Sequence, residues 1–275
     1  MSIQRGTSLR RKYAIAFALL LGFCGVVAAA EFKIGGSGAA LGTMQLIGGA
    51  FTAANRDIRV TIVPSLGSGG GIKAVVAGAI DLAVTSRPMT EGERKLGAVE
   101  TEYARTPFVF AVSAKSKVTA ITSTELTAIY AGSMENWPDG SPVRLVLRPV
   151  SDIDNVIVRS LSPEIDRALS MAETRPGVRF SVNDQDAAND LEKIPGAIGP
   201  SSLALILSEK RALRALKFDG REPTAHKGAS GAYPYYKRLF LVTGAKPSAA
   251  VERFIAFVQS PAGRKILAGN GQWIP

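Results

Sequence analysis

The sequence predicts an α/β protein. Short β-branched or apolar segments alternate with segments whose apolar residues recur at helical spacing, which is the pattern of strands and helices packed in layers. Glycine- or serine-rich turns lead from a strand-like into a helix-like segment at three places. The 275 residues show no internal repeat and no low-complexity tract. Together these observations indicate strands in mostly parallel sheets, covered by helices.

The first thirty residues form an export signal. A basic opening that includes Arg10-Arg11 precedes an uncharged apolar run, Ala14–Ala30, which ends in three alanines. This order of basic, apolar and small residues is typical of a secretory signal peptide cleaved near Ala30. An uncleaved membrane anchor is the alternative, since the run is at the lower limit of a bilayer span. The arginine pair leaves twin-arginine export open beside ordinary secretion.

The only cysteine, Cys24, lies inside this segment. A lipoprotein cysteine would follow a small residue, whereas Phe23 precedes this one, so we expect Cys24 to leave with the signal. The mature chain then has no disulfide and no cysteine-based zinc site. Its net charge falls from +10 to +6, with 29 Lys and Arg against 23 Asp and Glu. That balance suits an exported protein that attracts anions, and the scattered cations argue against nucleic acid as a partner.

The mature chain, about 245 residues, is long enough for one large or two modest domains. Its first part alternates strongly between the two patterns. In order, we expect a strand at 32–34, a helix at 41–55, a strand at 59–63, a helix at 72–77, and strands at 80–84 and 108–114. The glycines 69–71 are expected in the loop before the second helix.

The second part continues the alternation with shorter elements. Ser123 is expected to cap a helix at 124–130, with Glu125 in its first turn. A strand at 143–147, helices at 155–161, 165–171 and 184–192, a strand ending at 197–199 and two amphipathic helices within 247–268 follow.

Three strand–turn–helix loops indicate an anion site. They are residues 35–40, 65–71 and 148–155. Such loops direct backbone N–H groups and the positive end of a helix dipole at one place, and serine hydroxyls add hydrogen bonds. In an open α/β sheet they gather at the carboxyl ends of the strands. Any one such loop could be only a tight turn, and neither glycine-rich loop has the spacing of a nucleotide-binding motif.

Two arginines fit an oxyanion. Arg87 follows the third predicted strand, and Arg148 ends the strand at 143–147. A guanidinium group offers a planar, always charged fork for an oxyanion. A solvated surface charge is the alternative for either residue, less so for Arg148 because it ends an apolar strand.

An enzyme is poorly supported by this sequence. The only histidine, His226, lies in a polar loop, and no Gly-x-Ser-x-Gly elbow supplies a nucleophile. One histidine and no mature cysteine exclude most zinc sites. Asp152, Asp154 and Asp184 lack the spacing of a calcium loop. We therefore expect no catalytic residue, no metal and no cofactor.

From Phe32 nearly to its end, the chain resembles periplasmic phosphate-binding proteins of ABC transporters, within the type II periplasmic binding protein superfamily. Four stretches in family-like order and spacing carry the resemblance: "SLGSGGGIKAVVAGAIDLAVTSRP", "STELTAIYAGSMENWPDG", "PGAIGPSSLALI" and "YPYYKRLFLVTGAKPSAAVERFIAFVQSPAGRKILAGNG". The resemblance implies two α/β lobes with mixed sheets flanked by helices and two crossing hinge strands. Lobe I would comprise residues 31–114 plus 226–275, and lobe II residues 115–225.

The resemblance also implies a function and its partners. A monomer in the periplasm would close its lobes on phosphate or a similar inorganic oxyanion and deliver it to an ABC permease in the inner membrane. Binding, and not catalysis, would be the function. The ligand-binding positions carried over are Ser37, Gly38, Ala39, Ser68, Gly69, Ser86, Arg87, Arg148, Ser151, Asp152 and Asn155.

Two positions depart from the family pattern. Phosphate-specific relatives place an aspartate where this chain has Ser86, although serine also occurs there. After the family's arginine comes Gly-Ser-Gly-Thr, whereas "PVSDIDN" follows Arg148, so that Asp152 and Asp154 stand where neutral donors are expected. Carboxylates in an anion cradle repel the ligand unless they turn away or accept a ligand proton. The same fold with a different solute, or a sensing module without import, therefore stays as the alternative.

Overall fold

The computed structural model describes residues 30–275. The predicted signal segment therefore lies outside the described residues except for Ala30, which begins the first strand. The strands are β1 (Ala30–Gly36), β2 (Ile58–Ile62), β3 (Leu82–Thr85), β4 (Val99–Ser113), β5 (Ala120–Ile121), β6 (Arg144–Leu147), β7 (Arg179–Phe180), β8 (Ala197–Ser202), β9 (Leu213–Ala215), β10 (Lys217–Phe218) and β11 (Tyr236–Thr243).

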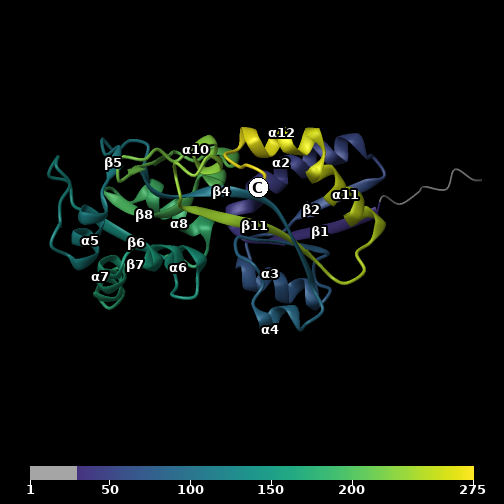
Figure 1. Cartoon of the computed structure of the whole chain (residues 1–275), viewed down its shortest axis with the longest axis horizontal. Coiled ribbons are helices and arrows are strands. Elements are labelled where there is room, and N and C mark those ends of the chain that lie inside the picture. The colour runs from purple at the N-terminus through teal and green to yellow at the C-terminus, as the bar shows by residue number, and fades with distance from the viewer. Residues whose placement is uncertain (1–29) are drawn as a thin grey trace, which may run out of the picture.

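The helices cover both faces of the strands (Figure 1). They are α2 (Gly38–Ala54), α3 (Gly67–Val76), α4 (Glu91–Arg94), α5 (Ser123–Ala131), α6 (Ile153–Ser160), α7 (Pro163–Glu173), α8 (Asp184–Lys193), α9 (Leu203–Ser208), α10 (Ala225–Ala229), α11 (Ala249–Gln259) and α12 (Pro261–Gly269). The predicted α/β class is confirmed by this arrangement.

The sheet is mixed rather than mostly parallel. Its strand order is β2-β1-β3-β11-β4-β8-β6-β7, with β9 also on β4, while β5 and β10 form a separate pair. β1 is parallel to β2 and β3, but β11 is antiparallel to β3 and β4. The expectation of mostly parallel strands was wrong because β4 and β11 run in opposite directions through the middle of the molecule.

Two strands join the halves of the molecule, as the resemblance implies (Figure 1). Residues 99–107 of β4 pair with β11, and residues 108–113 of the same strand pair with β8 and β9. Each half has a core of its own. Phe32, Phe51 and Phe254 pack edge to face in one half, with ring centroids 5.3–6.5 Å apart. In the other half Phe108, Phe110 and Phe218 form a similar group. The division at residues 114/115 and 225/226 stays a prediction.

Several predicted helix starts differ from the structure, by five residues at α3, three at α2 and one at α5. α3 begins at Gly67, so the glycines 69–71 lie inside its first turns rather than in a loop. Gly71 fits there because a Cβ at this position would come within 2.8 Å of the Gly36 Cα, so α3 packs directly on the end of β1. At α5 the cap is Thr122, which forms a capping box with Glu125, and Ser123 is the first helical residue.

Candidate functional site

Three serine hydroxyls meet at the carboxyl ends of β1 and β3. Ser37 follows β1 and precedes α2, Ser86 follows β3, and Ser68 lies in the first turn of α3. Because β1 and β3 are parallel neighbours, with Gly36 beside Val84, both strands end at the same edge. The Ser37 Oγ donates to the Ser86 Oγ at 3.0 Å, and the Ser68 Oγ lies 3.3 Å from the Ser86 Oγ. We call these three residues the serine cluster.

The two helices at the serine cluster have no acidic residue of their own at their N-termini, although Asp184 of α8 approaches the Ala39 N–H of α2. α2 and α3 have no side-chain N-cap hydrogen bond and no acidic residue in their first turns. Helix N-termini without such partners leave backbone N–H groups and a partial positive charge available. This edge of the sheet is therefore chemically suited to an anion.

A cleft of about 470 Å³ adjoins the serine cluster. On one side it is lined by the serine cluster, residues 67–70, Lys73, Arg87 and Glu93, and on the other by Pro149, Ser151, Asp152, Ile153, Val182 and Asp184. The second set follows β6 or β7 or begins α6 and α8, so the two halves of the chain face each other across the cleft. Of the predicted site residues, Ser37, Ser68, Gly69, Ser86, Arg87, Ser151 and Asp152 line it.

Arg87 lies in the cleft wall but is paired with an acid. Its Nη1 and Nη2 atoms donate to the two carboxylate oxygens of Glu93, each at 2.7 Å. The hydrogen bond from Arg87 lowers the pKa of Glu93 to about 2, so this pair is ionised at any physiological pH. A bidentate pair of this kind leaves little of the guanidinium free for a ligand.

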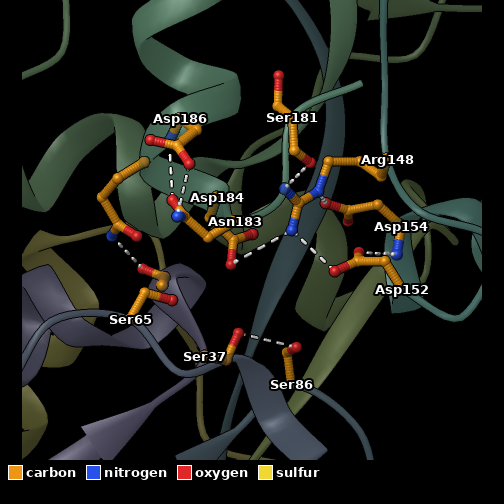
Figure 2. A network of polar contacts seen from close by, with 12 residues as sticks. Ser37, Ser65, Ser86, Arg148, Asp152, Asp154, Ser181, Asn183, Asp184 and Asp186 are labelled. Atoms are coloured by element: carbon orange, nitrogen blue, oxygen red, sulfur yellow. Dashed lines mark hydrogen bonds and ion pairs between the residues drawn. The ribbon is translucent and has the colours of Figure 1, made fainter. Parts of the chain in front are cut away.

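Arg148 lies behind the cleft rather than in its lining. Its side chain is only 2% exposed. Nη1 donates to the carbonyl oxygen of Ser181 at 2.7 Å, and Nη2 donates to the Asp152 carboxylate at 2.8 Å. Figure 2 shows Arg148 between Asp152 and Asp184, with Ser37 and Ser86 opposite. Asp152 also accepts from the Asp154 backbone N–H as the N-cap of α6, which fixes its position.

A lysine that the sequence analysis did not single out completes this group. Lys237 lies in β11 beside Thr106 of β4, where the two strands pass between the halves. Its ammonium contacts the Asp154 carboxylate and lies 3.6 Å from Asp184, while Arg148 lies 3.7 Å from Asp154 and 4.0 Å from Asp184. We call Arg148, Asp152, Asp154, Asp184 and Lys237 the charge cluster. The predicted oxyanion partner, Arg148, is therefore already surrounded by carboxylates.

Burial and ion pairing oppose each other within the charge cluster. Burial raises the pKa of Asp154 to about 7, although Lys237 acts in the other direction. Burial also opposes ionisation of Asp184, but Lys237 and Arg148 outweigh it, and the pKa of Asp184 lies below its usual value. Burial alone would lower the pKa of Lys237, and Asp154 and Asp184 raise it above its usual value. Both cations thus stay charged.

The remaining predicted residues contact the cleft wall from behind. Asn155 is buried, and its amide nitrogen donates to the Arg148 carbonyl at 3.3 Å and to Glu173 at 2.7 Å. Gly38 and Ala39 form the start of α2, against which α8 packs. The Gln185 amide donates to the Gly38 carbonyl at 3.2 Å, and the Ala39 backbone N–H contributes to the lowered pKa of Asp184. Gly38, Ala39, Arg148 and Asn155 lie outside the cleft lining.

The close approach of α8 to α2 allows a steric prediction. A Cβ at Gly38 would lie 2.2 Å from the Gln185 Oε1 and 2.8 Å from the Asp184 Cβ, whereas a Cβ at Gly49 on the same helix meets nothing within 4 Å. We expect Gly38→Val to separate the helices and to lower ligand affinity roughly tenfold, since overpacking costs ~1–3 kcal/mol. Small-angle scattering should show a larger radius of gyration for Gly38→Val than for the matched Gly49→Val. Equal radii and equal affinities would contradict the prediction.

Within residues 30–275, no group of three or more His, Cys, Asp or Glu side chains is placed to hold a metal ion. In the same range no helix is both long and apolar enough to cross a membrane.

Comparison with known proteins places this two-lobed fold with its interlobe cleft among solute-binding proteins. Residues 27–262 match the family model of the PBP superfamily domain, so the chain belongs to that superfamily. It is 25% identical over 258 residues to the phosphate-binding protein PstS of Bacillus subtilis, covering 90% of this chain and 81% of the relative.

Two solved structures have the same fold. A protein from Clostridium perfringens, solved with bound phosphate, matches with a TM-score of 0.74 at 20% identity, covering 89% of this chain and 99% of the other. The molybdate-binding protein of Azotobacter vinelandii matches with a TM-score of 0.64 at 16% identity, covering 89% of this chain and 99% of the other. The predicted periplasmic binding protein superfamily is confirmed by the family model, and the two-lobed fold by these two structures.

Proposed function

We propose that this chain is an exported solute-binding protein that captures phosphate or a similar oxyanion in its interlobe cleft and delivers it to an ABC importer. The observation that supports this proposal most directly is the serine cluster. The Ser37 and Ser68 hydroxyl oxygens lie 3.0 and 3.3 Å from that of Ser86, at the N-termini of two helices that have no acidic residue in their first turns. Hydroxyl and backbone donors of this kind suit a small tetrahedral anion.

The relatives support the ligand class. The Bacillus relative is a phosphate-binding protein, the Clostridium structure holds phosphate and the Azotobacter protein binds molybdate. In this proposal the mature chain acts as a periplasmic monomer, with no catalytic step, and its partner is a permease of the inner membrane. The C-terminal and N-terminal segments would form one lobe and the middle segment the other, closing on the ligand by a hinge motion of β4 and β11.

A second candidate rests on the charge cluster. Asp152 and Asp184 line the cleft opposite the serine cluster, and both are held there by Arg148. Two carboxylates facing the cleft would favour a solute with a cationic or hydrogen-bond-donating part over a bare oxyanion. The same fold would then bind a different solute, or act as a sensing module without import.

Calorimetry separates the two candidates. Mature protein is unfolded, washed free of ligand and refolded, then titrated with phosphate, sulfate, molybdate and small carboxylates. We expect at least one inorganic oxyanion to bind with a dissociation constant of about 1 µM or tighter, equivalent to about −8 kcal/mol. If no oxyanion gives a binding signal and an amine-containing or neutral solute binds, the first candidate is rejected and the second is favoured.

A further inference from the structure

The charge cluster carries more negative than positive groups. Two cations, Arg148 and Lys237, stand against three carboxylates, Asp152, Asp154 and Asp184. Lys237 is 0% exposed, Asp154 1% and Arg148 2%, so water screens these charges poorly. With every group ionised, the cluster has a net charge of −1 immediately behind the cleft.

The carboxylates, and not the cations, face the ligand. Asp152 and Asp184 line the cleft, with side chains 22% and 10% exposed, whereas Arg148 and Lys237 lie behind them. An anion at the serine cluster therefore meets a negatively charged wall across the cleft. Closure of the lobes removes water between them and strengthens this repulsion. Neutralising one negative charge in the cluster would favour closure on an anion.

Asp154 is the carboxylate best placed to be neutralised. Asp152 is hydrogen-bonded to Arg148 at 2.8 Å, and Lys237 and Arg148 hold Asp184 ionised. Asp154 is the most buried of the three acids, and burial raises its pKa to about 7. The charged and titratable groups that face it are Lys237 from β11, Arg148 after β6, Asp152 at the start of α6, Asp184 from α8 and Tyr130 from α5.

We propose that anion binding in this cleft is coupled to the uptake of one proton, and that Asp154 accepts it. The proton comes from solvent and adds to the Asp154 carboxylate, which takes the charge cluster from −1 to neutral. Lys237 and Arg148 then balance Asp152 and Asp184. Asp154 does not touch the ligand but acts through these neighbours as a positioning residue. This inference rests on the proposed binding of an oxyanion.

Calorimetry in buffers of different ionisation enthalpy measures the coupling. At one pH, the slope of the observed binding enthalpy against the buffer enthalpy equals the number of protons taken up. With phosphate at pH 8, where the free ligand is a dianion, we expect a slope close to one for the wild-type chain. Affinity should fall roughly tenfold per pH unit above neutral, as linkage requires for one proton. Asp154→Asn should reduce the slope to near zero and flatten the pH profile.

Glu102→Gln serves as the matched control. Glu102 is an ion-paired carboxylate, held by Arg105 and Arg238, that lies outside the cleft lining. Its replacement should leave the slope at the wild-type value. Because Asn at position 154 could disturb folding, the wild-type slope is also measured with sulfate or molybdate, which stay dianions between pH 6 and 9. With such an anion, a slope that rises with pH toward one places the proton on the protein, and a slope of zero contradicts uptake by the cluster.

Each outcome has a separate meaning. Phosphate binding with a slope of zero at every pH would overturn the inference and leave the proposed function intact. A slope near one that persists in Asp154→Asn would overturn the assignment to Asp154, since the proton would then reside on the ligand or on another acid. Absence of any oxyanion binding at micromolar to millimolar concentration would overturn the proposed function and, with it, the coupling.

Discussion

Replacing Lys237 with methionine is expected to destabilise the protein by about 3–5 kcal/mol at pH 8, because this removes the ammonium that Asp154 contacts in the interior. The pH dependence follows from the pKa of Asp154, which burial raises to about 7. Lys237 opposes the burial that raises this pKa, so its removal raises the pKa of Asp154 further. At pH 8 the variant must hold Asp154 either ionised without its partner or protonated against the solvent pH, whereas protonation costs less at pH 6. The loss should therefore be clearly smaller at pH 6. Urea unfolding of both proteins at the two pH values measures it.

Two further variants control this prediction. Lys227→Met removes a lysine whose ion pair with Glu222 is half-exposed, and such pairs contribute about 0–1 kcal/mol. Combining Lys237→Met with Asp154→Leu removes both partners, and replacement of a buried pair by apolar residues is often neutral. We expect the double variant to regain most of the lost stability. An equal loss at both pH values, with no recovery in the double variant, would show that Lys237 acts through packing alone.

Removing two hydroxyl groups from the serine cluster should abolish most of the oxyanion binding. A hydrogen bond to a charged group contributes about 1.5–3 kcal/mol, so Ser37→Ala with Ser68→Ala should lower the affinity by about 100-fold or more. Calorimetric titration with the best oxyanion of the panel measures the effect. The unfolding midpoint should fall only modestly, since the variant loses the few hydrogen bonds that Ser37 and Ser68 make with Ser86.

Ser208→Ala is the matched control for the serine variants. The Ser208 hydroxyl donates to the Ala204 carbonyl at 2.7 Å within α9, outside the cleft lining. Its removal should leave oxyanion affinity unchanged. If the double variant of Ser37 and Ser68 binds within about threefold of the wild-type affinity, then the anion does not lie at the serine cluster.

The sequence predicted the serine side of the cleft more completely than the other side. Ser37, Ser68 and Ser86 follow or begin elements with clear periodicity, and parallel neighbouring strands must end at one edge. The start of α3 was missed because Gly67–Gly71 has the composition of a loop, and packing against β1 overrides that local preference. Local pattern thus located the loops that form this side, although not their secondary structure.

The charge cluster could not be assembled from local pattern. Its members come from the end of β6, the starts of α6 and α8, and β11. Lys237 and Arg238 precede an apolar run, residues 239–242, within β11. The lysine beside this run was the available signal, since a lysine is seldom fully buried without partners. The sequence identified Asp152 and Asp154 as carboxylates that are unusual beside an anion site. It did not show that Lys237 forms ion pairs with Asp154 and Asp184.

The position of β11 has a consequence for the order of folding. This strand lies between β3 and β4 in the sheet, yet residues 236–243 follow β4 only after the whole of residues 114–235. Because β3 and β4 pair only with β11 between them, they are not joined in one sheet until β11 is in place. Until then Asp154 also lacks the Lys237 ammonium beside it. Contacts between residues so distant along the chain form slowly. In the proposed export, both halves therefore stay incomplete until β11 has crossed the membrane, and its pairing then completes the sheet and brings the Lys237 ammonium to the buried Asp154 in one step.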